Sequence, residues 1–452
     1  NQEQYDINGP TTLFSSLPQR KQGVAGRVSY SYDGRYYIEG NFGYNGSENF
    51  AKGHRFGFFP SIAVGYNISN EKFWQPIKPV ISNLKIRGSW GLVGNDATNA
   101  GRFAYMEDLV LGGSDSYTTG IRQDTYYSGP SWNRYFNPDL TWEVGEKINL
   151  GLDLQLFNDF NLTFDIFREK RRDIFMTREN SIPEIVGTGE TKITSNNGEM
   201  ENKGLDLAID YNKQITKDFF LSFKSTLTFA RNKVLKMDEP PYFEYPGLSD
   251  VGHPLGTYWG YVADGLFPDQ ETIDNSPRQD LGYTPQPGDI KYVNQPNAKG
   301  EYDNVINSND RVAIGHPYDP ELVYGFGPSM KWKNWDFSFF FQGVARTSFM
   351  MYGMHPFGTT SIKNMLQFVA DDHWSVDNPN PNAAYPRLTK DSNGNNDQYS
   401  TYWLRNAAFL KLKNAEIGYT YKGMRFYLSG VNLLTFSPFK HWDPEMGGGN
   451  GL

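Results

Sequence analysis

The chain has 452 residues, 51 of them acidic and 43 basic, with a net charge of -8 and no cysteine. The acidic balance and the absence of a long basic run argue against a nucleic-acid partner. The lack of cysteine excludes disulfides, thiolate catalysis and cysteine-ligated metals. No run of 18 apolar residues occurs, so the sequence encodes no transmembrane helix. The strands of a membrane barrel would escape this test, because they alternate apolar and polar residues and their mean hydropathy is therefore polar.

Alternating apolar and polar residues predict about twelve strands, many of them longer than the roughly 9–11 residues that cross a bilayer at a tilt. In chain order the predicted strands are 21–32, 35–46, 55–68, 82–94, 141–157, 160–176, 198–213, 218–234, 320–333, 335–348, 404–421 and 424–436. The stretch INLGLDLQLF at 148–157 is the clearest, because Asp153 and Gln155 fall on the face opposite the apolar residues. That apolar face consists of Ile148, Leu150, Leu152, Leu154 and Leu156.

The connections alternate between short and long. Tight turns are predicted at Asp33-Gly34, Asn158-Asp159, Asn334 and Lys422-Gly423, with a slightly longer turn at 69–81. The long polar connections are 95–140, 177–197, 235–319 and 349–403. This alternation places all short turns at one end and all long loops at the other, as in an antiparallel up-and-down transmembrane β-barrel. Greek-key connections of a sandwich would not produce it.

A sandwich and a membrane barrel share the same strand alternation, so the direction of the apolar face needs a second signal. Aromatic residues gather at many strand ends, among them Tyr36, Trp332, Trp335 and Tyr419. Ordinary strand propensity favours aromatics as well. Their recurrence beside the short turns favours the aromatic girdle of a membrane barrel. The apolar face at 148–156 is therefore expected to meet lipid, and Asp153 and Gln155 to face a wet lumen.

The sequence offers little support for catalysis. None of the six histidines pairs at metal-ligand spacing, and no HExxH, P-loop or GxSxG motif occurs. We therefore expect no enzyme activity, no catalytic residue and no cofactor. A secreted glycan-binding or glycan-hydrolysing β protein stays open as the alternative.

The segment 287–311 concentrates oxygen-bearing side chains, which is a composition that calcium favours. These residues are Asp289, Asn294, Asp303, Asn304 and Asp310. A turn-rich surface loop has the same composition and is the interpretation we prefer, so no metal site is predicted.

Several motifs, in order along nearly the whole chain, resemble the SusC/RagA family of TonB-dependent outer-membrane transporters of Bacteroidetes. They include LKIRGSWGLVGND (84–96), NPDLTWEVGEKINLGLDLQLF (137–157), GHPLGTYWGYVADGLF (252–267), PGDIKYV (287–293) and LSGVNLLTF (428–436). In relatives PGDIKY often continues into a calcium-like turn; here NQPNAKGEY replaces it.

The resemblance implies that residues 1–452 form the C-terminal portion of a barrel of about 22 strands, with long extracellular loops. The plug domain and the TonB box would lie outside this chain. It further implies a multi-pass protein of the outer membrane that imports oligosaccharides or oligopeptides. Its partners would be TonB, membrane lipid and a SusD-like surface lipoprotein acting as a lid.

Two further expectations concern the loops and the ends. Loop residues that would contact cargo or the lid, or simply pack the loops, are Tyr126, Tyr127, Trp132, Arg134, Tyr135, Tyr258 and Trp259. Bacterial barrels have an even number of strands. With the tight turns placed in the periplasm, one more strand is expected after Leu452 and an odd number, about nine for the family's 22, before Asn1.

Overall fold

The computed structural model describes residues 2–4, 17–97, 101–110, 116–178, 180–186, 193–351, 365–389 and 392–447. The chain divides into two compact units, the first formed by 1–213 with 230–240 and the second by 214–229 with 241–452. Within the described residues, no helix combines the length and the apolar character needed to cross a membrane.

The first unit is built on an antiparallel sheet whose long strands lie in chain order. The strands are β1 (Gln2–Gln4), β2 (Gln19–Tyr32), β3 (Tyr36–Ser47), β4 (Phe56–Asn67), β5 (Ile81–Asn95), β10 (Glu143–Leu156), β11 (Phe160–Arg178) and β12 (Ile193–Thr216). Each pairs antiparallel with the next in this order. Such a meander is the up-and-down arrangement that the connection lengths predict.

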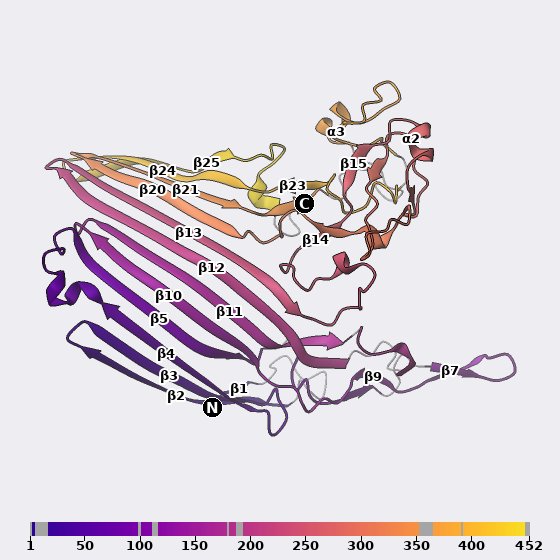
Figure 1. Cartoon of the computed structure of the whole chain (residues 1–452), viewed down its shortest axis with the longest axis horizontal. Helices are drawn as coiled ribbons and strands as arrows, with labels where there is room; N and C mark the ends of the chain where they lie inside the picture. Colours follow the sequence, from indigo (N-terminus) through magenta and orange to yellow (C-terminus); the bar gives the residue numbers. More distant parts are fainter. Residues whose placement is uncertain are drawn as a thin grey trace. The chain divides into compact units, whose positions relative to one another are not determined.

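The second unit continues the same design with five strands. They are β13 (Phe219–Lys236, which belongs to this unit as far as Phe229), β20 (Leu322–Trp332), β21 (Trp335–Ala345), β24 (Phe409–Tyr421) and β25 (Met424–Phe436), again paired antiparallel in chain order. All twelve predicted strands are therefore confirmed. In each unit the tight turns lie at one end of the strands and the long connections at the other (Figure 1).

The tight turns owe their shape to left-handed backbone positions. Asp33 and Gly34 have φ angles of 50° and 62°, and Lys422 and Gly423 have 47° and 83°. Two consecutive left-handed residues make the type I′ turn, whose twist matches that of the flanking strands. Glycine adopts this conformation at no steric cost, which explains why it occupies the second position of both turns.

Some predicted strand boundaries are wrong. β12 begins at Ile193 rather than 198 and β11 extends to Arg178, so the connection predicted at 177–197 is shorter. The predicted strand 404–421 is two strands, because β23 (Leu404–Asn406) leaves the sheet and pairs with β22 (Ser348–Met350). β21 ends at Ala345, since the next residue, Arg346, has a left-handed φ of 56° that breaks the extended backbone.

The strands carry an apolar band on one face. Along β10, Ile148 is 42% exposed and Leu150 52% exposed. The register places the apolar residues of β10 from Ile148 to Leu154 in rows with those of the neighbouring strands. These are Leu84, Ile86 and Trp90 of β5 and Leu162, Phe164 and Ile166 of β11, which in turn pair with Ile209, Leu207 and Leu205 of β12. None of these side chains belongs to a buried core cluster of the described residues. An apolar band that stays outside any buried core is what the outer surface of a membrane barrel requires.

The opposite face of the sheet is polar and ion-paired. On this face Arg87 of β5 contacts Asp153 of β10 at 3.2 Å and Asp165 of β11 at 2.5 Å. In the second unit Arg425 of β25 makes the same kind of contact with Asp336 and Glu416. Ion pairs thus connect neighbouring strands on the polar face, while the opposite face is apolar. A polar face of this kind is expected to line a hydrated lumen.

Aromatic side chains mark the ends of the apolar band. The rings of Tyr36 and Tyr66 stack at 5.0 Å, and both hydroxyls donate to Glu71, at 2.7 and 3.2 Å. At the other end of the band, the Trp90 indole donates to Glu146 at 2.8 Å. Rings that are apolar on the body and polar at the tip suit a boundary between lipid and water.

The connections between the long strands, and the segment after β25, contain short elements of their own. In the first unit these are η1 (Ile68–Asn70), η2 (Lys72–Trp74), β6 (Asp108–Val110), β7 (Ser116–Thr119), β8 (Thr125–Ser128), β9 (Ser131–Arg134) and η3 (Glu184–Val186). In the second they are η4 (Pro246–Leu248), β14 (Tyr258–Gly260), β15 (Ala263–Leu266), α2 (Gln270–Asp274), β16 (Arg278–Gln279), β17 (Ile290–Tyr292), β18 (Val305–Ile306), η5 (Ser308–Asp310), β19 (Val312–Ile314), β22, α3 (Gln367–Asp371), β23 and η6 (Pro444–Gly447).

Candidate functional site

Two long connections of the second unit fold together into one body, here called the loop subdomain (the described parts of 241–321 and 346–408). Its core brings residues near 261–306 against residues near 349–407, with Phe439 from beyond β25. Ile290 and Ile306 are completely buried, and Tyr292 is 2% exposed. Loops that bury their own core hold a fixed shape, which a binding surface requires.

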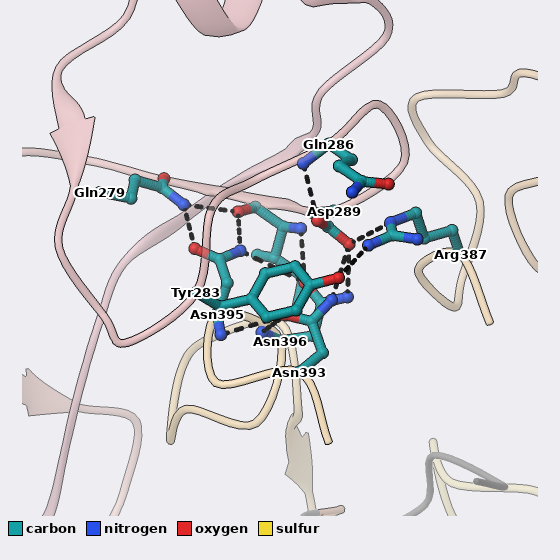
Figure 2. A network of polar contacts seen from close by, with 9 residues as sticks. Gln279, Tyr283, Gln286, Asp289, Arg387, Asn393, Asn395 and Asn396 are labelled. Carbon is teal, nitrogen blue, oxygen red and sulfur yellow. Dashed lines mark hydrogen bonds and ion pairs between the residues drawn. The ribbon is translucent and has the colours of Figure 1, made fainter. Parts of the chain in front are cut away.

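A completely buried carboxylate, Asp289, lies at the centre of this subdomain. Its Oδ1 atom accepts hydrogen bonds from Arg387 Nε at 2.7 Å and from the side-chain amides of Asn393 and Asn396, both at 2.9 Å. Its Oδ2 atom accepts from the backbone N–H of Gln286 at 2.8 Å. Figure 2 shows these donors around the carboxylate. A buried charge is tolerated only when it is paired and hydrogen-bonded in this way.

Side-chain amides also satisfy the backbone next to Asp289. Gln279 donates to the Ile290 carbonyl at 3.0 Å and accepts from the Tyr292 N–H at 2.7 Å. Asn395 donates to the same Ile290 carbonyl at 2.9 Å, and Gln279 also donates to Asn395. Because buried backbone groups must find partners, these amides join two segments about a hundred residues apart. We call Asp289 and these amides, together with Arg387, the polar centre.

The charge of Arg387 is stabilised by the same contacts. Burial opposes the charged form, yet the hydrogen bond to Asp289 and its negative charge hold the pKa of Arg387 above its usual value. The Nη2 atom of the same guanidinium donates to the Tyr283 hydroxyl at 2.8 Å. Arg387 therefore connects the buried carboxylate to an aromatic side chain nearer the surface.

The oxygen-rich segment 287–311 uses its carboxylates to hold turns. Asp310 accepts from the backbone N–H groups of Gln295 and Asn307 at 2.7 and 2.8 Å, and burial raises its pKa. Asp303 accepts from the N–H of Val305 at 2.9 Å. With Asp289 occupied as described, these contacts match the turn-rich loop that we preferred from sequence. Within the described ranges, His, Asp and Glu side chains do not gather in groups of three or more that would hold a metal ion.

Five of the predicted contact residues lie in the long connection of the first unit. Tyr126 and Tyr127 belong to β8, which pairs only along its short length with β7, and every residue of both strands is exposed. Tyr127 stacks on Tyr117 at 5.2 Å. These tyrosines are thus displayed on a narrow hairpin.

The other three lie just beyond this hairpin. Trp132 stacks on Tyr135 with ring centroids 5.5 Å apart. The Nε of Arg134 donates to the Met106 carbonyl at 2.9 Å, and burial lowers the pKa of Arg134. Their contacts fasten the strand that carries them to the neighbouring segment.

Tyr258 and Trp259 belong to the loop subdomain, in β14, which pairs with β19. Trp259 donates its indole N–H to Asp250 at 2.6 Å and meets the edge of His253. Burial raises the pKa of Tyr258 to about 12. Both side chains are half-buried and make part of the packing of the subdomain.

Sequence reasoning missed the polar centre except for Asp289, which it placed in the oxygen-rich segment. Gln279, Arg387, Asn393, Asn395 and Asn396 have no periodicity that would mark them. The stretch Asn-Gly-Asn-Asn at 393–396 was the one available signal, and in isolation it indicates an ordinary polar turn.

An antiparallel meander with an exposed apolar face, a charged opposite face and long loops at one end defines a β-barrel of the bacterial outer membrane. Residues 1–433 match the family described as "TonB dependent receptor-like, beta-barrel", and the chain belongs to that family.

The curated relatives include the TonB-dependent receptor SusC of Bacteroides thetaiotaomicron, which is 29% identical over 450 residues, covering 94% of this chain and 41% of that receptor. A TonB-dependent receptor of Formosa agariphila is 27% identical over 444 residues, covering 93% of this chain and 42% of that protein. The chain therefore spans less than half the length of these relatives.

Solved structures agree on the fold. The RagAB peptide transporter matches with a TM-score of 0.72 at 21% identity, over 97% of this chain and 47% of that one. The 'open-open' state of the RagAB peptide importer matches with a TM-score of 0.73 at 22% identity, over 97% and 46%. The resemblance to SusC/RagA transporters, the all-β barrel fold and the outer-membrane location are confirmed.

Proposed function

We propose that this chain is part of a TonB-dependent importer that carries oligosaccharides or oligopeptides across the outer membrane with a SusD-like lipoprotein as lid. The observation that carries the proposal is the family match over residues 1–433, combined with long loops that fold into a structured body at one end of the strands. The relatives are named as TonB-dependent receptors and as a peptide transporter. Energy would reach the barrel through TonB.

The polar face of the sheet supports passage of a hydrated cargo. Arg87 pairs with both Asp153 and Asp165, so its charge partly offsets theirs while the surface stays hydrophilic. A hydrophilic lumen of this kind lets a polar solute pass while it stays hydrated. The alternative of a secreted glycan-active protein loses its support, since a wide exposed apolar band would aggregate in water.

The hairpin β7–β8 is the feature that best fits contact with a lid. An isolated two-stranded hairpin is marginally stable in water, and this one exposes Tyr126 at 62% and Tyr127 at 47%. Tyrosine is enriched where proteins meet. We assign the lid contact to these two residues, with Trp132, Arg134 and Tyr135 at the hairpin base as supporting contacts. Tyr258 and Trp259 are secondary candidates for cargo or lid contact.

Import is tested by uptake in cells that carry the full-length transporter or its gene deletion. Labelled oligosaccharides and labelled oligopeptides are supplied separately, with and without a protonophore. The proposal expects one class to accumulate, and expects both the deletion and the protonophore to abolish it. Uptake that survives both treatments for every cargo offered would contradict it.

The lid contact is tested by affinity purification of the full-length transporter from its own membrane. Replacing Tyr126 and Tyr127 together by alanine is expected to lower recovery of a surface lipoprotein by about tenfold, the equivalent of about 1.4 kcal/mol. Tyr302→Ala, which removes a tyrosine that is 61% exposed on another loop, is the matched control. If no lipoprotein is recovered with the unaltered transporter at any salt concentration, the proposed lipoprotein lid is contradicted.

A further inference from the structure

An open hollow of about 830 Å³ lies on the loop subdomain, bounded by the single continuous segment 267–286. Small-molecule sites commonly occupy about 300–1,000 Å³. The lining includes Asp274, Arg278, Asp280, Tyr283, Thr284 and Gln286. Its lining includes none of the residues assigned above to the lid.

The floor of the hollow is fixed to the polar centre. Phe267, 1% exposed, exchanges backbone hydrogen bonds with the segment that carries Asp289: its N–H donates to the Asp289 carbonyl at 2.9 Å, and its carbonyl accepts from Gly288 at 2.7 Å. Gln279, also in the lining, donates to the Ile290 carbonyl at 3.0 Å. The hollow is therefore formed before any ligand arrives, which lowers the entropy cost of binding.

One aromatic wall is held in place by the same centre. Asp289 binds Arg387 Nε, and the other branch of Arg387 donates to the Tyr283 hydroxyl at 2.8 Å. Figure 2 shows the three side chains in this order. A half-buried tyrosine whose hydroxyl is already bonded offers a rigid ring for stacking at little conformational cost.

The remaining lining mixes donors and acceptors of opposite charge. Arg278 and Asp280 lie 3.3 Å apart at their charged atoms and are 71% and 59% exposed. With Asp274 the lining carries two carboxylates and one guanidinium, a balance that disfavours an anionic ligand. Paired carboxylate and guanidinium groups offer acceptors and donors side by side, as neighbouring hydroxyls of a sugar require.

We propose that this hollow is a subsite for neutral oligosaccharide, in which a sugar ring stacks on Tyr283 while Arg278 and Asp280 bind its hydroxyls. Arg387 and Asp289 act as positioning residues that set the orientation of the tyrosine. The inference rests on the proposed import function and deepens it, because it selects oligosaccharide over oligopeptide as the cargo. The subsite captures cargo on the loops before it enters the barrel.

The test uses the full-length transporter purified with its lipoprotein partner. The probes are labelled malto-, xylo-, manno- and β-gluco-oligosaccharides, and a pool of short peptides. One saccharide series is expected to bind and to protect the hollow segment from hydroxyl-radical labelling. Tyr283→Ala should weaken its affinity by about tenfold or more. Tyr283→Phe keeps the ring but loses the bond to Arg387, so it should weaken affinity by a smaller factor, about threefold, as Arg387→Lys should.

Matched variants separate the subsite from general disturbance. Tyr302→Ala removes an exposed tyrosine outside the lining, and Asp264→Asn removes a carboxylate paired with Lys291 on the surface. Both should leave affinity unchanged, whereas Asp280→Asn should weaken it several-fold. Arg387→Lys cannot reach both Asp289 and Tyr283, so it should weaken saccharide binding through added mobility of Tyr283, seen as increased radical labelling of that ring.

The outcomes distinguish this inference from the import proposal. Equal affinity of Tyr283→Ala and Tyr302→Ala, or no saccharide-dependent protection of 267–286, overturns the subsite even if energy-dependent uptake occurs. Uptake of peptides but not of saccharides likewise overturns the subsite and leaves import intact. Absence of energy-dependent uptake for every cargo overturns import, and protection of 267–286 by a saccharide would still establish the binding site.

Discussion

The strands expose apolar side chains, whereas the loop subdomain buries them. Ile148 and Leu150 of β10 are 42% and 52% exposed, whereas Ile290 and Ile306 of the loops are completely buried. In a water-soluble protein the strands would hold the core and the loops would be polar. The inversion indicates that a nonaqueous surrounding covers the strands, while the loops, which stand in water, need a core of their own.

The two regions also satisfy their backbone groups differently. The strands exchange N–H and C=O bonds with their neighbours in long ladders, such as the thirteen paired positions from Val144 to Leu156 between β10 and β11. The loops pair over two to four residues at a time and use side-chain amides such as Gln279 and Asn395 for the rest. The strands depend on register, and the loops depend on particular side chains.

The largest effect is expected from removing the buried carboxylate. Asp289→Ala leaves Arg387 charged and without its partner inside the subdomain, which should destabilise the loops by about 3–5 kcal/mol. Hydrogen exchange on the full-length protein in detergent should show rapid exchange throughout 241–321, 365–389 and 392–408. Exchange of the strand ladders should stay unchanged.

Asp264→Asn is the control for that experiment. Asp264 pairs with Lys291 at 2.8 Å, but its side chain is 60% exposed, so its removal should cost less than about 1 kcal/mol. If Asp289→Ala exchanges no faster than Asp264→Asn, the polar centre does not hold the loops together.

A smaller loss is expected from placing a charge on the apolar band. Leu152→Arg should destabilise the full-length barrel by about 2–4 kcal/mol near the bilayer midplane. Gln155→Arg, on the opposite face of the same strand, should cost about 1 kcal/mol or less, because its guanidinium reaches water. Urea unfolding in liposomes measures both variants, and equal losses would contradict the assignment of the two faces.

The smallest effect concerns the strap (residues 437–445), which follows β25 and returns to β24. Hydrogen bonds from Lys411 and Lys413 hold the pKa of Glu445 below its usual value. A lowered pKa stabilises the folded strap above the ordinary carboxyl pKa of about 4.3, and that stabilisation is lost as the pH falls through the lowered value. Hydrogen exchange of 437–445 should therefore rise selectively below about pH 4.3.

Lys411→Met tests the cause of that pH response. Lys411 is completely buried and contacts Asp443 at 2.5 Å and Glu445 at 2.6 Å. Without the ammonium group the strap should exchange faster at neutral pH and respond less to acid. An unchanged acid response in this variant would show that other groups control the strap.

The strands were predictable because apolar and polar residues alternate with a period of two along each of them. The alternation from Ile148 to Leu156 needs no knowledge of any partner strand, and the Asp33-Gly34 and Lys422-Gly423 turns carry their own signal. Boundaries failed where distant residues decide them: the strand predicted at 404–421 is split because Leu404–Asn406 pairs with Ser348–Met350. The local sequence of neither segment indicates this pairing.

The loop core and the polar centre were beyond sequence reasoning for the same reason. Asp289 and Arg387 are ninety-eight positions apart, and strands of two to four residues have no period to detect. Asn393 and Asn396 look like turn residues until the structure places a carboxylate between them. The hollow at 267–286 depends on that centre, so it was equally hidden.

The central claim is that one face of each long strand meets lipid and the other meets water. The chain contains no cysteine, so single cysteines can be introduced at each position from 148 to 156 of the full-length protein in its native membrane. Labels at 148, 150, 152, 154 and 156 should be quenched by a lipid-soluble agent, and cysteines at 149, 151, 153 and 155 should react with a water-soluble reagent. Uniform reactivity with the water-soluble reagent along the strand would contradict the account.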